Sequence, residues 1–270
     1  MIAAPLCTPD FSETISMHPI PDPYFYAAAI PAVILAGLSK GGFGGSMAML
    51  AVPILSLVVS PIQAAGIMLP ILVAMDVVGL FAYKGRADRR SLMILLPAAM
   101  AGIAVGWATA TLVNQSFVRL LVGVISLIFV ADYLLKSARA NEAREHNVGK
   151  GLICGAIAGF TSFVSHTGAP PFQLYMMPLR LAPTLFAGTA VIFFSVVNAL
   201  KLIPYFMLGQ FDTVNLATSA MLLPLAPLAT AVGVWLVRIV DQGIFYKMTY
   251  AIMTVVGIKL VWDGATALAG

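Results

Sequence analysis

The sequence predicts an all-α polytopic membrane protein with two inverted-topology repeats, each a re-entrant broken-helix hairpin plus three transmembrane helices. Three observations carry this prediction. Hydrophobic residues make up 60% of the 270 positions and charged residues only 10%, which excludes a soluble domain of this size. Apolar runs of about 20 residues, the length that spans a bilayer as a helix, recur along the chain. The order of broken and unbroken runs is the same in both halves.

The first half begins with a polar tail, residues 1–23, which lacks the basic start and apolar core of a secretory signal. Residues 24–39 and 45–60 are apolar, but each run is short for a full span. A re-entrant hairpin around the glycine-rich break between them is therefore favoured over two spans. Unbroken spans are expected at 62–83, 91–112 and 116–136, so the first repeat covers 24–136.

A linker, residues 137–149, leads into the second repeat, residues 150–264. Its broken pair is 150–163 and 169–179, interrupted by a turn that contains His166 and followed by prolines. Unbroken spans are expected at 184–208, 215–236 and 243–264, before a C-terminal tail at 265–270. The halves align at a shift of 122 residues, which places Ala36-Gly37 on Ala158-Gly159, Pro61 on Pro183 and Asp76 on Asn198.

Loop charges predict the orientation, because cytoplasmic loops carry an excess of Lys and Arg. Basic residues cluster at 84–90 and 136–150, whereas the loop at 209–214 has none. We therefore expect inverted halves in a bacterial inner membrane, with both termini periplasmic. Parity does not distinguish a hairpin from two spans, so the hairpin interpretation depends on segment length.

The first break contains Lys40, the only charged residue between Asp22 and Asp76. An ionisable group beside a broken helix at membrane depth is costly unless it lines a site. Glycine lets a ligand approach the backbone, and a half-helix starting near Gly45 would direct N–H groups and a positive dipole end at an anion. Alternatively, the glycines only permit close packing and Lys40 snorkels to an interface. The substrate-binding residues expected here are Ser39, Lys40, Gly41, Gly42, Gly44, Gly45 and Ser46.

The second break supplies hydroxyl groups and an imidazole, which can bind an oxyanion without burying a second full charge. His166 can also carry a coupled proton, since its reference pKa lies near 6.5; alternatively it hydrogen-bonds the backbone that the break frees. The expected substrate-binding residues are Ser162, Ser165, His166, Thr167, Gly168 and Gln173.

A third group, expected to serve coupling or gating together with His166, comprises Asp76, Asn198 and Lys201. Lys201 lies three residues after Asn198, so both share a helix face. An intramembrane carboxylate is rarely idle. Asp76 either forms a structural pair with Lys201 or Lys40, or takes up a proton.

The turn Ala-Gly-Leu-Ser-Lys-Gly-Gly-Phe-Gly-Gly at 36–45 and the second turn at 158–171 resemble the TauE/SafE family of sulfite exporter-like permeases. The resemblance covers about 24–264. It implies an anionic substrate such as sulfite, an organosulfonate or a small carboxylate. The second motif departs from the family, because Ser165-His166-Thr167 stands where many relatives are richer in glycine, so substrate identity is not carried over.

The sequence thus predicts a secondary transporter, in the direction of export, for a small sulfur-containing anion such as sulfite or a short-chain organosulfonate, bound near the midplane. An inside-negative potential drives an anion outward by about 2.3 kcal/mol per charge per 100 mV, so export needs no coupled ion. The alternatives are proton coupling, an uptake permease or channel for another small anion, and an intramembrane hydrolase using Ser162 or Ser165 with His166. We expect no cofactor, metal or nucleic acid; the partners are the anion and the bilayer, with a homodimer left open.

Overall fold

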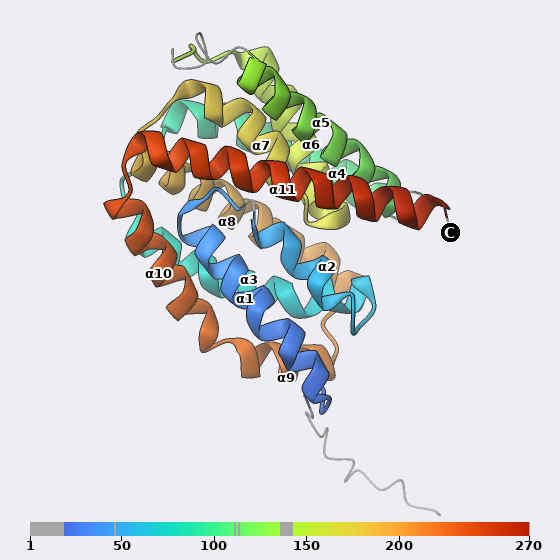
Figure 1. The fold of residues 1–270 in the computed structure, drawn as a ribbon. Coiled ribbons are helices and arrows are strands. Elements are labelled where there is room, and N and C mark those ends of the chain that lie inside the picture. The colour runs from blue at the N-terminus through green and yellow to red at the C-terminus, as the bar shows by residue number, and fades with distance from the viewer. Residues whose placement is uncertain (1–18, 46, 111, 113, 136–142, 270) are drawn as a thin grey trace, which may run out of the picture.

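The computed structural model describes residues 19–45, 47–110, 112, 114–135 and 143–269, and within these ranges the chain is helical, with no strands. The elements of the first half are α1 (Pro23–Gly42), the 3-10 helix η1 (Met47–Leu50), α2 (Ala51–Leu55), α3 (Pro61–Ala82), α4 (Arg89–Ala108) and α5 (Gln115–Leu135). Those of the second half are α6 (Val148–Ser165), α7 (Ala169–Met176), the 3-10 helix η2 (Met177–Leu179), α8 (Pro183–Met207), α9 (Thr213–Leu222), α10 (Leu225–Ile239) and α11 (Gln242–Ala269). Figure 1 shows their arrangement.

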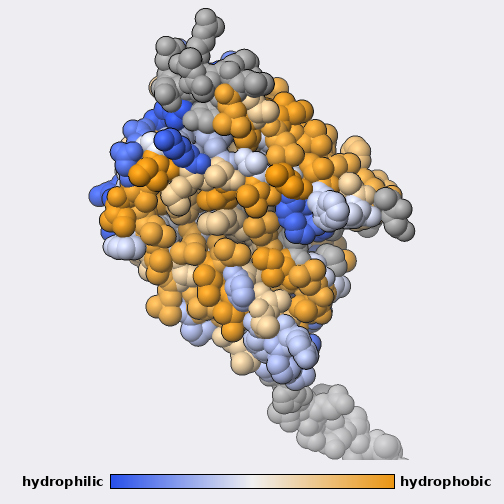
Figure 2. Space-filling view, viewed as in Figure 1, coloured by the Kyte–Doolittle hydropathy of each residue, from blue (hydrophilic) through white to orange (hydrophobic). Residues whose placement is uncertain are grey.

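Six of the described helices, α1, α3, α4, α6, α8 and α11, are long and apolar enough to cross a membrane. Helices α9 and α10 bend by 47° at a short break, and counting this pair as one span gives seven. Hydrophobic residues cover most of the face seen in Figure 2, as expected of a surface in contact with lipid. The chain is therefore a multi-pass helical membrane protein.

Side-chain caps fix the starts of four helices, at polar residues just before the apolar runs. Ser60, Asp88, Asn147 and Asp212 each accept a hydrogen bond from a backbone N–H in the first turn of α3, α4, α6 and α9, respectively. Such caps satisfy donors that have no partner within the helix. These positions agree with the expected segment starts to within a few residues.

The first limb of each broken pair is longer than expected. Helix α1 has 20 residues and α6 has 18, so both reach the length of a span, and the prediction that these limbs are short is wrong. Helix α1 continues through Gly41 and Gly42, where the sequence suggested that the helix had already broken. The returning limbs are short, and η1 and α2 pack back against α1 while α7 packs against α6 (Figure 1).

Small residues let pairs of helices approach closely, with α1 against α10, α4 against α6 and α5 against α11. A Cβ atom added at Gly159 would lie 2.1 Å from the carbonyl oxygen of Ala99 on α4. One added at Gly41 would lie 2.4 Å from the carbonyl oxygen of Thr230 on α10. Close backbone contact of this kind is a common basis of helix association in membranes. It also explains why α1 tolerates glycines in its last turn.

Candidate functional site

The two breaks lie next to each other inside the molecule. In the first, Gly44 and Gly45 have φ of 64° and 79°, a region that favours glycine. In the second, His166 ends α6 with φ 55° and ψ 24°. Gln173 on α7 donates from Nε2 to the carbonyl oxygen of Phe43 at 3.1 Å, which ties the second hairpin to the first break.

The backbone donors of the first break are largely occupied. The N–H groups of Phe43 and Gly45 donate to the carbonyl oxygen of Ser39, and that of Met47 donates to its Oγ at 2.9 Å. The helix that follows is the four-residue η1, which starts at Met47. The expectation that a half-helix from Gly45 points free N–H groups at a ligand is therefore wrong, because Ser39 caps these donors.

Asp76 on α3 joins the two halves of the chain. Lys40 forms an ion pair with Oδ1 of Asp76, and both side chains are buried. Asn198 on α8 donates to Oδ2 of the same carboxylate at 2.7 Å. Lys40 thus does not snorkel, and Asp76 forms the structural pair that was one of the two alternatives. The two residues matched by the 122-residue shift, Asp76 and Asn198, are in direct contact.

Lys201, one turn along α8 from Asn198, has a different environment. Its side chain is buried, with 1% exposed, and its Nζ lies 3.2 Å from Ser162 Oγ, 3.3 Å from Ser162 O and 3.4 Å from His166 Nδ1. Within the described residues no carboxylate forms an ion pair with it. Lys201 is therefore a buried amine whose hydrogen-bond partners are neutral, and Asp76 attracts it electrostatically without forming an ion pair.

These groups surround an inner pocket of about 30 Å³ between the two breaks. The pocket draws on both halves of the chain, and its lining residues are Lys40, Gly45, Ala48, Met49, Leu72, Ser162, His166, Ala169, Phe194, Asn198 and Lys201. Two lysines, one hydroxyl, one imidazole and one amide thus meet an apolar wall. The arrangement favours a small anion.

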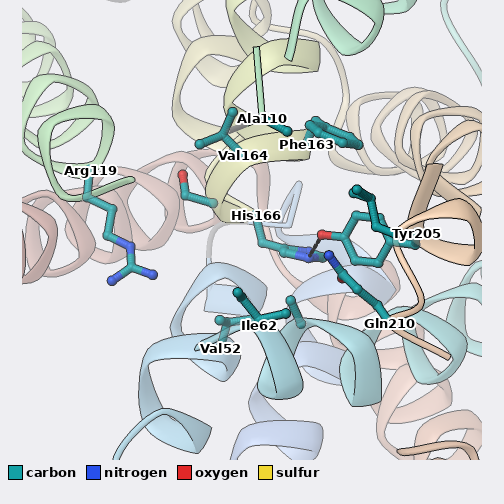
Figure 3. A pocket seen from close by; sticks show the side chains of 12 residues that line it. Val52, Ile62, Ala110, Arg119, Phe163, Val164, His166, Tyr205 and Gln210 are labelled. Carbon is teal, nitrogen blue, oxygen red and sulfur yellow. Dashed lines mark hydrogen bonds between the residues drawn. The ribbon is translucent and has the colours of Figure 1, made fainter. Parts of the chain in front are cut away.

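A second and larger cavity, of about 260 Å³, lies on the other side of His166 (Figure 3). His166 lines both cavities, and its Nε2 lies 2.7 Å from the hydroxyl of Tyr205. Arg119 from α5 and Gln210 after α8 also line the outer cavity. Arg119 and Tyr205 were not expected from the sequence. A charge near the start of the apolar run 116–136, well before Asp132 and Lys136 at its end, was an available signal for Arg119.

The remaining expected site residues lie outside the inner pocket. Gly41 and Gly42 face α10, in agreement with the packing alternative, and the hydroxyl of Thr167 contacts Ser165 Oγ at 2.7 Å. A Cβ atom on Gly168 would meet the carbonyl oxygen of Ala158 at 2.6 Å, so this glycine serves the contact between α6 and α7. Ser46 lies outside the described residues.

The contacts of the serines bear on the hydrolase alternative. Ser162 Oγ accepts from Lys201 and Ser165 Oγ pairs with Thr167, and in the described part of the chain neither hydroxyl hydrogen-bonds His166. His166, the base named in that alternative, is therefore not bonded to either serine, and the nitrogen within hydrogen-bond reach of Ser162 Oγ is Lys201 Nζ at 3.2 Å. No cluster of His, Cys, Asp or Glu that could hold a metal occurs among the described residues.

These features define a polytopic helical membrane protein with a buried, cation-lined pocket between two broken helices. The sequence model of the family described as sulfite exporter TauE/SafE matches residues 29–260, so the chain belongs to this family. Its members are transporters of sulfite-type anions. No curated protein and no solved structure matches the chain.

Proposed function

We propose that the protein is a secondary transporter that exports a small sulfur-containing anion, such as sulfite or a short-chain organosulfonate, across a bacterial inner membrane. The observation that carries this proposal is Lys201, a buried amine that forms no ion pair with a carboxylate among the described residues and that a bound anion would keep protonated. Moving a charge from water into a protein interior costs on the order of several kcal/mol, unless an opposite charge compensates it. A bound anion supplies that charge.

The proposed ligands of the anion are Lys201, Lys40, Ser162 and His166, with Gly45 leaving room at the first break. Lys40 is already paired with Asp76, so it contributes less net attraction than Lys201. A pocket of about 30 Å³ admits little more than water. An oxyanion of the size of sulfite therefore requires that the lining, with His166 as its shared wall, move outward on binding.

Alternating access of two inverted repeats is the proposed mechanism. The packing of α1 on α10 and of α6 on α4 supports the repeat, because the 122-residue shift relates α1 to α6 and α4 to the bent pair that contains α10. The contacts of α3 with α8 and of α5 with α11 each join equivalent elements. When each helix is replaced by its equivalent in the other half, the same set of helix contacts is therefore obtained.

The proposed direction follows from charge. An inside-negative potential favours exit of an anion by about 2.3 kcal/mol per charge per 100 mV, without a coupled ion. With basic loops at the cytoplasmic side, both termini are periplasmic. Uptake would need a coupled proton, for which His166, at the boundary of the two cavities, is the candidate.

Purified protein in proteoliposomes tests this function. We expect an imposed inside-positive potential to drive sulfite inward faster than in empty liposomes, with taurine, isethionate, sulfate and acetate as competitors that rank the substrates. A proton gradient should change the rate only if a proton is coupled. Absence of potential-driven flux of every anion in this panel would overturn the proposal.

A further inference from the structure

We propose that the outer cavity holds a second anion-binding site centred on Arg119, which the transported anion occupies on its way to or from the inner pocket. This inference rests on the proposed function for the identity of the anion. The site itself follows from the place of Arg119 in the lining of this cavity and from the residues that line it with Arg119 (Figure 3).

Arg119 lies in the second turn of α5, inside an apolar run, and lines the outer cavity. Its Nε is buried and has no hydrogen-bond partner in the described part of the chain. A buried polar group without a partner costs free energy that a ligand can recover. The guanidinium group presents two parallel N–H donors, which match the oxygens of a sulfonate or sulfite.

One acidic residue lies near this site and is shared with another cation. Asp263 on α11 attracts Arg119 electrostatically, but its carboxylate already pairs with Lys259 at 2.5 Å. Among the residues that the structure describes, no carboxylate lines the cavity. The side chains that face Arg119 across it are neutral and polar or apolar, and an anion there meets a positive wall without an opposing negative one.

Other polar groups line the same cavity. Ser165 contributes a hydroxyl group, and Gln210 contributes an amide whose oxygen is buried without a hydrogen-bond partner among the described residues. Rotation of that amide exchanges its acceptor for an N–H₂ donor. The cavity of about 260 Å³ is also large enough for the carbon chain of an organosulfonate, which the inner pocket is not.

His166 connects the two sites. Its Nε2 faces Tyr205 in the outer cavity, while its Nδ1 lies 3.4 Å from Lys201 Nζ in the inner pocket. Rotation of this one ring therefore joins the cavities. An anion that moves between the two cavities would pass from a guanidinium to an amine with an imidazole between them.

Equilibrium binding of radiolabelled sulfite to the purified full-length protein in detergent tests the inference. We expect two sites in the wild type and one in Arg119→Gln. The affinity of the outer site for sulfite should fall by at least about tenfold in this variant, because a charge-assisted contact is removed. Arg119→Lys should restore part of the affinity. Arg90→Gln, an exposed arginine at the start of α4, is the matched control and should leave both sites unchanged.

Lys201→Met separates this inference from the proposed function. Loss of one site in Lys201→Met and of the other in Arg119→Gln supports both. A single site that survives Arg119→Gln and Arg119→Lys unchanged overturns the outer site and leaves the inner one standing. A single site that survives Lys201→Met but not Arg119→Gln supports the outer site and overturns the inner pocket. Elution as a single species on size exclusion shows that each variant is folded.

Discussion

Replacing Lys201 by Met removes the buried cation while keeping a side chain of similar length and flexibility. The neutral contacts of the lysine, with Ser162 and His166, leave no carboxylate behind when it is removed. The variant therefore changes the charge of the inner pocket without creating an unpaired charge elsewhere. This property makes it the sharpest available test of the proposed site.

The expected size of the effect follows from Coulomb's law. A monovalent anion in contact with Nζ would lie about 4 Å from it, and at an effective dielectric constant of about 20 the attraction is about 4 kcal/mol. That energy corresponds to about a thousandfold loss of affinity. Because a buried cation without a counter-charge carries a desolvation cost, folding stability should stay equal or rise.

Potential-driven sulfite flux into proteoliposomes measures KM, and thermal unfolding in detergent measures stability. Lys247→Met, at an exposed position of α11, is the matched control and should keep both values. We expect Lys201→Met to lose flux at all accessible concentrations while its unfolding midpoint is unchanged or higher. Wild-type flux in Lys201→Met would refute the reasoning, since the anion would then be held by other groups.

Three further changes test other parts of the structure. Lys40→Met leaves Asp76 as an unpaired buried charge and should destabilise the protein by about 3–5 kcal/mol in unfolding experiments. The double variant Lys40→Met/Asp76→Asn should recover most of this stability. Equal stability of the single and the double variant would contradict the ion pair. Gly159→Val forces α4 and α6 apart and should cost at least about 1–3 kcal/mol in the same assay, whereas Gly149→Ala, whose Cβ would meet Asn147 Oδ1 at an ordinary contact distance of 3.6 Å, should cost little. Tyr205→Phe removes one hydrogen bond of His166, about 1 kcal/mol, and should speed sulfite flux by up to about fivefold; slower flux argues against a barrier there.

Much of the fold could be predicted from hydropathy and from helix breakers. The turn at His166 and the glycines at 44 and 45 were recognisable, because left-handed backbone and prolines leave strong local signals. The continuation of α1 through Gly41 and Gly42 was not. Helix-breaking tendency is overridden there by the close approach of α10, a contact between residues about 190 positions apart in sequence that no local pattern records.

The site was harder to predict than the fold. The partners open to Asp76 were visible as intramembrane charges, and Lys40 proved to be the one that pairs with it. Which lysine would then lack a counter-charge depends on how α1, α3 and α8 pack, so Lys201 could not be singled out in advance. The 122-residue shift matches Ser162 to Lys40. Ser162 contacts Lys201, which lies on α8, the span that follows the second broken segment.

The charges of the inner pocket have an electrical consequence. When both lysines are protonated, two lysines against one aspartate leave a single positive charge in the empty protein, and a monovalent anion cancels it. Reorientation of the loaded protein then moves no net charge through the membrane field, whereas reorientation of the empty protein does. For such cargo, an inside-negative voltage acts on the return stroke, drawing the vacant pocket back toward the cytoplasm to collect the next anion.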